Sequence, residues 1–131
     1  MCMIDACDER FRLFIKTPIN KSRKDYKCWE CSRTIRRGEP YLRIRSLDGE
    51  SGWHTNHICQ HCQVAIEWLT KNCGGVVVGM VGDDIEEHVE EYGDFGLARL
   101  RYGIRYQWTR RKTGKPMPVP RMPRTLEEIS R

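Results

Sequence analysis

Two cysteine pairs carry the clearest chemical pattern in the sequence. Two residues separate Cys28 from Cys31, and two separate Cys59 from Cys62. This spacing lets both sulfurs of a pair reach one tetrahedral metal ion from a tight turn, at about 2.3 Å each. Four soft thiolates select zinc over magnesium or calcium, and iron is the competing metal. We therefore predict one structural zinc ion bound by these four cysteines.

A closed four-cysteine site has no open coordination position, so we do not expect it to activate water. Its contribution is folding energy, about 10–16 kcal/mol for comparable small sites. The alternatives are four free thiols, or a ligand set in which His57 or His61 replaces a cysteine. Both histidines lie beside the second pair, and the simpler interpretation makes them surface residues.

Three further cysteines lie outside this set. Cys2, Cys7 and Cys73 would form a second, Cys3His metal site together with His88. The spacing of Cys2 and Cys7 falls within the range seen in zinc fingers. The alternative is one small buried cysteine, two N-terminal thiols and a core histidine with its hydrogen bonds satisfied.

The elements around the cysteines predict an α+β fold with a small, zinc-stabilised, treble-clef-like core of a β-hairpin plus a helix. Residues 41–45 alternate apolar and basic side chains, residues 47–52 contain two turn signals, and residues 53–58 form the returning strand. Residues 59–71 have helical periodicity, with Cys62, Ala65, Ile66 and Leu69 on one stripe, and Gly74 ends that helix. A short strand is predicted near residues 11–15.

Additional helices follow the core. Asp83 or Asp84 is predicted to cap a second helix, which ends at Gly93. Residues 95–109 fit either a helix or a strand, and we prefer a helix because the segment is long and poor in β-branched residues. Thr125 and Glu128 form a capping-box pattern for a short last helix.

The composition of the C-terminal segment predicts an extended, basic, Pro-rich arm. Residues 112–123 contain four of the six prolines. We therefore divide the chain into a zinc-binding core domain, residues 1–109, and an arm, residues 110–131. The arm has few apolar groups to offset its ordering entropy. We accordingly expect residues 110–124 to pack little, and deletion of residues 110–131 to leave zinc content and thermal stability nearly unchanged.

The composition of the chain argues against a membrane-spanning or secreted protein. The 131 residues are 39% hydrophobic and 31% charged, and the net charge is +5. Apolar runs are too short to span a membrane, and the N-terminus lacks the apolar region of a secretory signal. We therefore expect a cytoplasmic protein. Seven acids crowd residues 83–94, while ten basic residues face only two acids after residue 98. The basic blocks either form a solvated surface or contact a polyanion.

A basic segment leads into the first C-x2-C pair at residues 21–31, and a Gly-Glu-x-Tyr strand and a closing C-x2-C pair follow it, at residues 34–35, 38–39, 41 and 59–62. In these features the sequence resembles a widespread group of small phage and prophage zinc-binding accessory proteins of unassigned function. The resemblance continues more loosely through a Cys-Gly-Gly segment and an acidic helix at residues 73–93. The resemblance implies metal binding and a phage origin, and hence the cytoplasm of a host cell.

Two hypotheses for function follow. In the first, the protein binds nucleic acid with little sequence specificity through its basic blocks, because no base-reading helix is evident. The candidate contact residues are Arg105, Trp108, Arg110, Arg111, Lys112 and Lys115. Trp108 would either anchor the arm to the core or stack on a base. In the second, the protein is an adaptor or inhibitor of a host protein, supported by the acidic helix and by the PxxP spacing of Pro120 and Pro123.

A nuclease of the His-Asn-His type is a third, weaker alternative. It is prompted by residues 54–57, but no Asp-His dyad accompanies them. The sequence also lacks a phosphate-binding loop, a dinucleotide fingerprint and a Ser-His-Asp set. We therefore expect no enzyme activity, no membrane partner and no small-molecule substrate.

Overall fold

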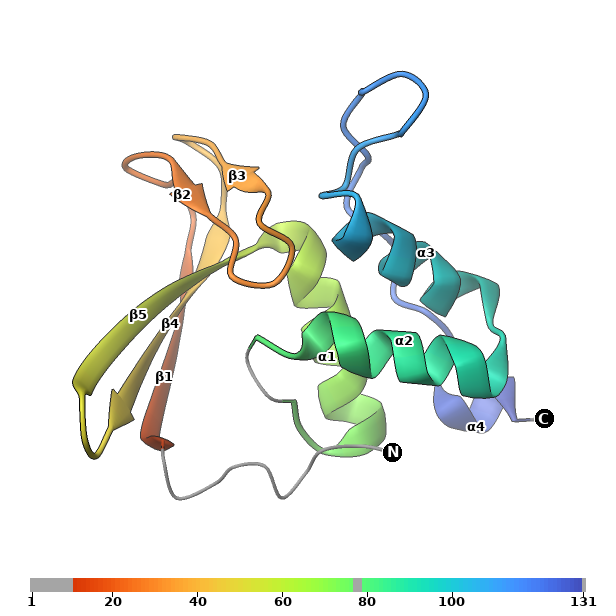
Figure 1. The fold of residues 1–131 in the computed structure, drawn as a ribbon, viewed down its shortest axis with the longest axis horizontal. Coiled ribbons are helices and arrows are strands. Elements are labelled where there is room, and N and C mark those ends of the chain that lie inside the picture. The colour runs from red at the N-terminus through yellow and green to blue at the C-terminus, as the bar shows by residue number, and fades with distance from the viewer. Residues whose placement is uncertain (1–10, 77–78, 131) are drawn as a thin grey trace.

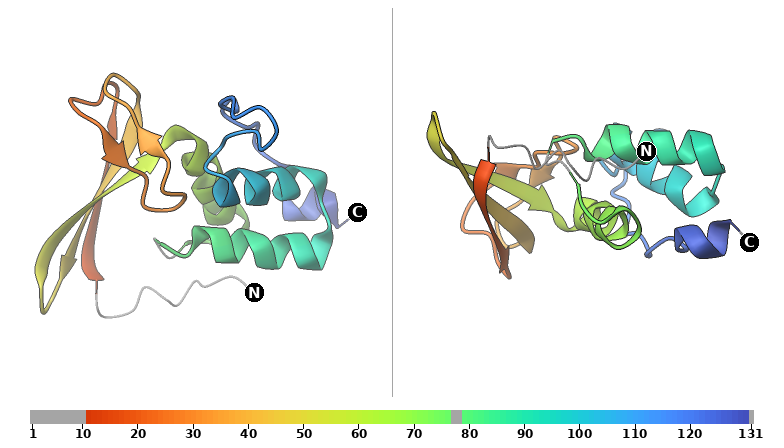
Figure 2. Two further views of the ribbon diagram at one scale, coloured as in Figure 1. Left: turned by 45° about the horizontal axis from the view of Figure 1, so that its top comes forward. Right: turned by 90° about the horizontal axis from the view of Figure 1, so that it is seen from below.

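A three-stranded antiparallel sheet and a group of helices make up the two halves of the fold (Figure 1). The computed structural model describes residues 11–76 and 79–130. The sheet has the order β1-β4-β5, formed by β1 (Phe11–Ile19), β4 (Tyr41–Asp48) and β5 (Gly52–Cys59). Figure 2 shows the helices gathered to one side of this sheet. The predicted α+β class is confirmed.

Strands β4 and β5 form the predicted hairpin, in which Tyr41 pairs with Cys59. Strand β1 is longer than predicted and runs along β4 as an edge strand. Pro18 lies opposite Leu42 in this pairing. An edge strand tolerates proline because one side of the strand needs no N–H donor.

A second, two-stranded sheet pairs β2 (Tyr26–Lys27) with β3 (Thr34–Ile35). The turn between these strands contains the first cysteine pair, and the end of β5 leads into the second. The two pairs therefore belong to separate β elements that the fold must bring together.

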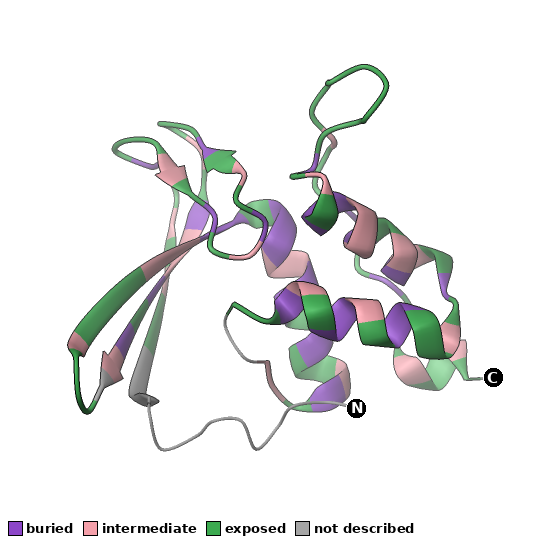
Figure 3. Ribbon diagram, in the orientation of Figure 1, coloured by how far each residue is buried: buried purple, intermediate pink, exposed green. Residues whose placement is uncertain are grey.

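Helix α1 (Gln60–Cys73) begins directly after β5. The predicted stripe of Cys62, Ala65, Ile66 and Leu69 is buried, together with Trp68. Gly74 ends the helix in a left-handed conformation with φ of 79°, as predicted. The apolar stripe of α1 thus faces the core, and Figure 3 shows buried positions concentrated among the helices while the far end of the β4–β5 hairpin is largely exposed.

Helix α2 (Val81–Tyr92) begins earlier than predicted. Its N-cap is Met80, which makes no side-chain cap bond, so the prediction of Asp83 or Asp84 as the cap is wrong. The side chain of Glu30 takes over this task from a distant part of the chain: its carboxylate accepts the Val81 N–H at 3.2 Å. A tertiary contact has therefore replaced the local cap.

Helix α3 (Phe95–Arg105) confirms the helical interpretation of residues 95–109, although it stops four residues short of that segment's end. Asp94 caps it by accepting the Leu97 N–H at 3.1 Å. The short helix α4 (Leu126–Ile129) has the predicted capping box of Thr125 and Glu128. None of the helices in the described part of the chain is long and apolar enough to cross a membrane.

The C-terminal segment packs against the helices, contrary to the prediction for residues 110–124. Residues 110–116 are exposed, as expected, but Pro120 and Pro123 are buried. Trp68 donates its indole N–H to the Arg124 carbonyl at 2.8 Å. Burial of both prolines also removes the PxxP spacing as support for an adaptor. The prolines follow no helical or strand period, so no sequence pattern indicated that they face the core.

Further contacts along α1 extend this packing. His61 donates to the Met117 carbonyl at 2.7 Å, and the Leu126 N–H donates to the Asn72 side chain at 2.8 Å. Arg124 forms an ion pair with the buried carboxylate of Asp94 at 2.8 Å. The segment after residue 116 is therefore part of the folded core.

Deleting residues 116–131 should destabilise the protein, contrary to what the sequence alone suggested. The hydrogen bonds of His61, Trp68 and Asn72 to this segment would be lost, and at about 1 kcal/mol each they account for about 3 kcal/mol. Urea unfolding followed by circular dichroism measures the loss. The exposed double variant Arg110→Ala, Lys112→Ala is the control and should unfold like the parent. An unchanged midpoint for the deletion would show that the segment contributes little to folding.

Candidate metal centre

The four cysteines of the two pairs meet in one buried cluster. Their sulfur atoms all lie within 4.8 Å of one another, and none of the four residues is more than 5% exposed. The Sγ atoms of Cys31 and Cys59 are 3.8 Å apart. A tetrahedron with metal–sulfur distances of about 2.3 Å has edges of about 3.8 Å. The cluster therefore has the composition and the dimensions to hold one metal ion.

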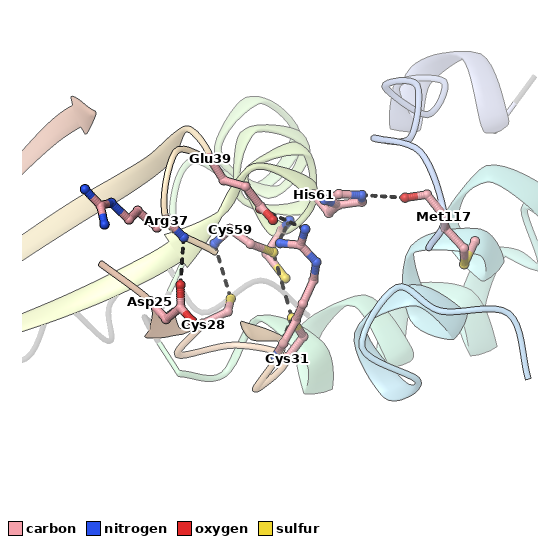
Figure 4. Close-up of polar contacts among 10 residues, drawn as sticks. Asp25, Cys28, Cys31, Arg37, Glu39, Cys59, His61 and Met117 are labelled. Atoms are coloured by element: carbon pink, nitrogen blue, oxygen red, sulfur yellow. Dashed lines mark hydrogen bonds and ion pairs between the residues drawn. The ribbon is translucent and has the colours of Figure 1, made fainter. Parts of the chain in front are cut away.

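Separate elements position the two pairs. Cys28 and Cys31 lie on a knuckle between β2 and β3, closed by hydrogen bonds from the Ser32 N–H to the Cys28 carbonyl and from the Cys28 N–H to the Arg33 carbonyl. Cys59 is the last residue of β5 and the N-cap of α1. Figure 4 shows the side chains of Cys28, Cys31 and Cys59 lying close together between these elements.

Three of the sulfurs accept a hydrogen bond from a backbone N–H. The Cys59 N–H donates to the Cys28 sulfur at 3.3 Å, and the Cys62 N–H donates to the Cys59 sulfur at 3.4 Å. The Arg33 N–H donates to the Cys31 sulfur, also at 3.4 Å. Such donors stabilise thiolates, the protonation state that a metal requires, and hold the ligands in place.

The fourth sulfur accepts its hydrogen bond from a distant side chain. Trp108 donates its indole N–H to the Cys62 sulfur at 3.4 Å, across 46 positions of the chain. Trp108 is only 1% exposed. It therefore anchors the chain to the core, one of the two roles predicted for it, and is too buried to stack on a base. No spacing in the sequence pointed to its contact with the cluster.

The crowded sulfurs shift one another's pKa. Hydrogen bonds from Cys28, followed by those from Cys31 and Cys62, lower the pKa of the Cys59 thiol. Hydrogen bonds with Cys28, Cys31 and Cys59 raise the pKa of the Cys62 thiol, and burial adds to that effect. A divalent cation at the centre of the cluster favours the thiolate form of all four groups.

Glu30 lies between the ligands Cys28 and Cys31 and links the knuckle to helix α2. Its carboxylate accepts the Gly79 N–H at 2.6 Å as well as that of Val81. Burial raises the pKa of Glu30 to about 7, although both N–H donors act in the opposite direction. Neighbouring Trp29 packs so closely that a Cβ atom on Gly79 would lie 2.4 Å from its indole nitrogen.

The histidines near the second pair are engaged elsewhere. His57 stacks on Tyr26 with ring centroids 3.8 Å apart, and burial lowers its pKa. His61 donates to the Met117 carbonyl through Nε2. His54, from the stretch that prompted the nuclease hypothesis, contacts the Ser51 hydroxyl at 2.9 Å. Among the described residues, the group that has the geometry of a metal site contains the four cysteines and no histidine.

Two members of the predicted second site do converge. Cys73 is disulfide-bonded in the structure, and its sulfur lies 3.2 Å from Nε2 of His88. Both residues are buried. Because Nδ1 of His88 donates to the Asp84 carbonyl at 2.7 Å, Nε2 carries the lone pair of the neutral ring. Cys2 and Cys7 lie outside the described residues.

The predicted contact residues other than Trp108 lie at the end of α3 and on the loop that follows it. Arg105 is the last residue of α3 and pairs with Glu86 at 3.0 Å. The remaining four, Arg110, Arg111, Lys112 and Lys115, are exposed on the loop. In Figure 1 this loop extends away from α3.

Comparison with known proteins found no match to a family model, a curated protein or a solved structure. Evidence for a function must therefore come from the residues of this chain.

Substituting Trp108→Phe should weaken metal binding without unfolding the protein. It removes the N–H donor to Cys62 while keeping an aromatic ring, and loss of such an outer hydrogen bond typically costs 10–100-fold in metal affinity. A chelator competition assay measures the change. Trp68→Phe is the matched control, because Trp68 is also fully buried and donates to a backbone carbonyl instead. Equal affinities for the two variants would show that the Trp108 bond does not act on the metal.

Proposed function

We propose that the chain is a zinc-binding accessory protein of the phage type that its sequence resembles, and that it binds nucleic acid through a basic loop, residues 110–115. The observation that carries the proposal is the concentration of four exposed basic side chains on this loop. No acidic residue occurs within it. A phosphate backbone is the polyanion that such a loop fits, and its contacts need no base-reading helix.

The loop is held in a defined conformation, which supports a binding role. Thr109 and Pro116 form a β-bridge at its base. Within it, the Arg110 N–H donates to the Lys115 carbonyl at 2.9 Å and the Gly114 N–H donates to the Arg110 carbonyl at 2.7 Å. A basic loop that is already ordered loses less entropy on binding than a disordered arm does.

The chain enters the loop through a strained turn. Gln107 and Trp108 both have φ of 56°, a left-handed conformation that costs about 1–2 kcal/mol for each such residue. Burial of the Trp108 ring offsets this cost: the ring packs directly on Gly103, where a Cβ atom would lie 2.1 Å from it. Local strain of this kind concentrates at functional sites.

In this proposal the metal is zinc and its role is structural. Four thiolates leave no coordination position for a substrate, so we expect stabilisation of the fold and no catalysis. The knuckle, the β4–β5 hairpin and α1 would together form the treble-clef-like unit. If the chain is encoded by a phage, it acts in the cytoplasm of the host cell.

A second zinc ion at Cys2, Cys7, Cys73 and His88 is an alternative to a single ion, and it requires reduction of the disulfide bond of Cys73. The contact between Cys73 and Nε2 of His88 supports it, because a metal-bound histidine typically donates its other ring N–H to a backbone carbonyl or carboxylate. That is the arrangement of His88 and Asp84.

Metal analysis of the reduced protein tests the second ion. The first site alone gives a zinc-to-protein ratio near one, whereas a ratio near two supports the second ion. In that case the variant His88→Gln should lower the ratio to near one while the first site stays filled. The exposed His54 offers a matched control, since His54→Gln should leave the ratio unchanged. A ratio near one in the parent protein would reject the second site.

Neutralising the loop tests nucleic-acid binding. The triple variant Arg110→Gln, Lys112→Gln, Lys115→Gln should bind an oligonucleotide several-fold more weakly at low salt. Three lost phosphate contacts, at about 0.7 each on a single strand, should also lower the slope of log affinity against log salt by about 2. Fluorescence anisotropy across a salt series measures both quantities.

The charge-matched control makes three equivalent substitutions to Gln outside the loop, at Lys16, Lys71 and Arg121, all of which are exposed. If the two triple variants lose equal affinity, the loop has no special role. If the parent protein binds no nucleic acid, an interaction with a host protein becomes the better explanation. Exposed Phe95 and the cleft beside it, which Met122 and Arg121 also line, are then the surface to test.

A further inference from the structure

A hollow of about 750 Å³ lies between the basic loop and the end of helix α3. Its lining residues are Tyr102, Arg110, Arg111, Lys112, Thr113 and Met117. The volume falls within the 300–1,000 Å³ of typical small-molecule sites.

The hollow combines an apolar wall with a cationic rim. Tyr102 and Met117 are half-buried, so part of each side chain remains accessible from the hollow. Arg110 and Lys112 are exposed on the loop side, and no acidic side chain among the described residues pairs with them. One wall thus suits the flat face of a base and the rim suits a phosphate.

Contacts at its edge hold this arrangement in place. The Tyr102 hydroxyl accepts the Arg111 N–H at 3.1 Å. The Arg111 guanidinium lies over the ring of Tyr106, 4.9 Å from its centroid, and the rings of Tyr102 and Tyr106 are 4.7 Å apart. Two tyrosine rings, tilted by 50° to each other, and one arginine therefore form a continuous cluster that orients Tyr102 relative to the loop.

We infer that the basic loop prefers single-stranded over double-stranded nucleic acid, because it takes one unpaired base against Tyr102 while Arg110 and Lys112 contact the adjacent phosphates. This inference rests on the proposed function. Paired bases in a duplex are stacked on their neighbours and reach such a hollow only if they are flipped out of the stack. A single strand presents the face of every base, and stacking on an aromatic ring tolerates any sequence.

Fluorescence anisotropy with an oligothymidylate, an oligouridylate and a DNA hairpin duplex of equal charge tests the inference. The full-length protein should bind both single strands roughly ten-fold more tightly than the duplex. Tyr102→Leu should remove most of that preference, because it deletes the ring. Tyr102→Phe keeps the ring and loses only the hydroxyl bond to Arg111, so it should retain the preference.

Tyr92→Leu provides the matched control, as Tyr92 is also half-buried on a helix but lies outside the hollow. Equal binding to duplex and single strand, or a preference that survives in Tyr102→Leu, would overturn the inference and leave the proposed function standing. If Tyr102→Leu and Tyr102→Phe lose the preference for single strands equally, that preference comes from positioning of the loop. This outcome would overturn base stacking on Tyr102. Absence of binding to all three probes would overturn the proposed function itself.

Discussion

The convergence of four cysteine sulfurs, each with one N–H donor, is the constraint on which the rest of the structure depends. The knuckle between β2 and β3, the end of β5 and the start of α1 all meet at this cluster, together with Trp108, two residues before the basic loop. Four buried thiolates with no cation would repel one another. A metal ion bound by all four would make the same group a source of folding energy in a chain with a mean hydropathy of −0.67.

Two side chains connect the cysteine cluster to parts of the chain that contain none of the four cysteines. Glu30, between two ligands, fixes the start of α2 through the N–H groups of Gly79 and Val81. Trp108 joins the Cys62 sulfur to the strained entrance of the basic loop. Loss of a metal ion from the cluster would therefore affect the surface proposed to bind nucleic acid, although the metal itself would not contact the nucleic acid. In this account the indole ring of Trp108 links metal content to nucleic-acid binding.

Local patterns predicted the parts of the fold that depend on local chemistry. The C-x2-C spacing located the cluster, alternating side chains located the β4–β5 hairpin, and the stripe including Ala65 and Leu69 located α1. The sequence could not predict contacts between distant residues. Helix α2 is capped by Glu30 rather than by Asp83 or Asp84, Pro120 and Pro123 pack on the helices instead of extending into solvent, and Trp108 meets Cys62 across the fold. Each of these depends on tertiary packing, which leaves no period or spacing in the sequence.

Hydrogen exchange of the backbone amides around the loop tests the central claim most directly, with the metal bound and after its removal by a chelator. The relevant amides are those of Trp108, Arg110, Gly114 and Met117, which all donate within or next to the loop. Our account predicts that chelation removes their protection together with that of the Cys59 and Cys62 amides, because one metal-dependent unit holds both. Loss of protection at the cysteines alone, with the loop amides unchanged, would contradict the account.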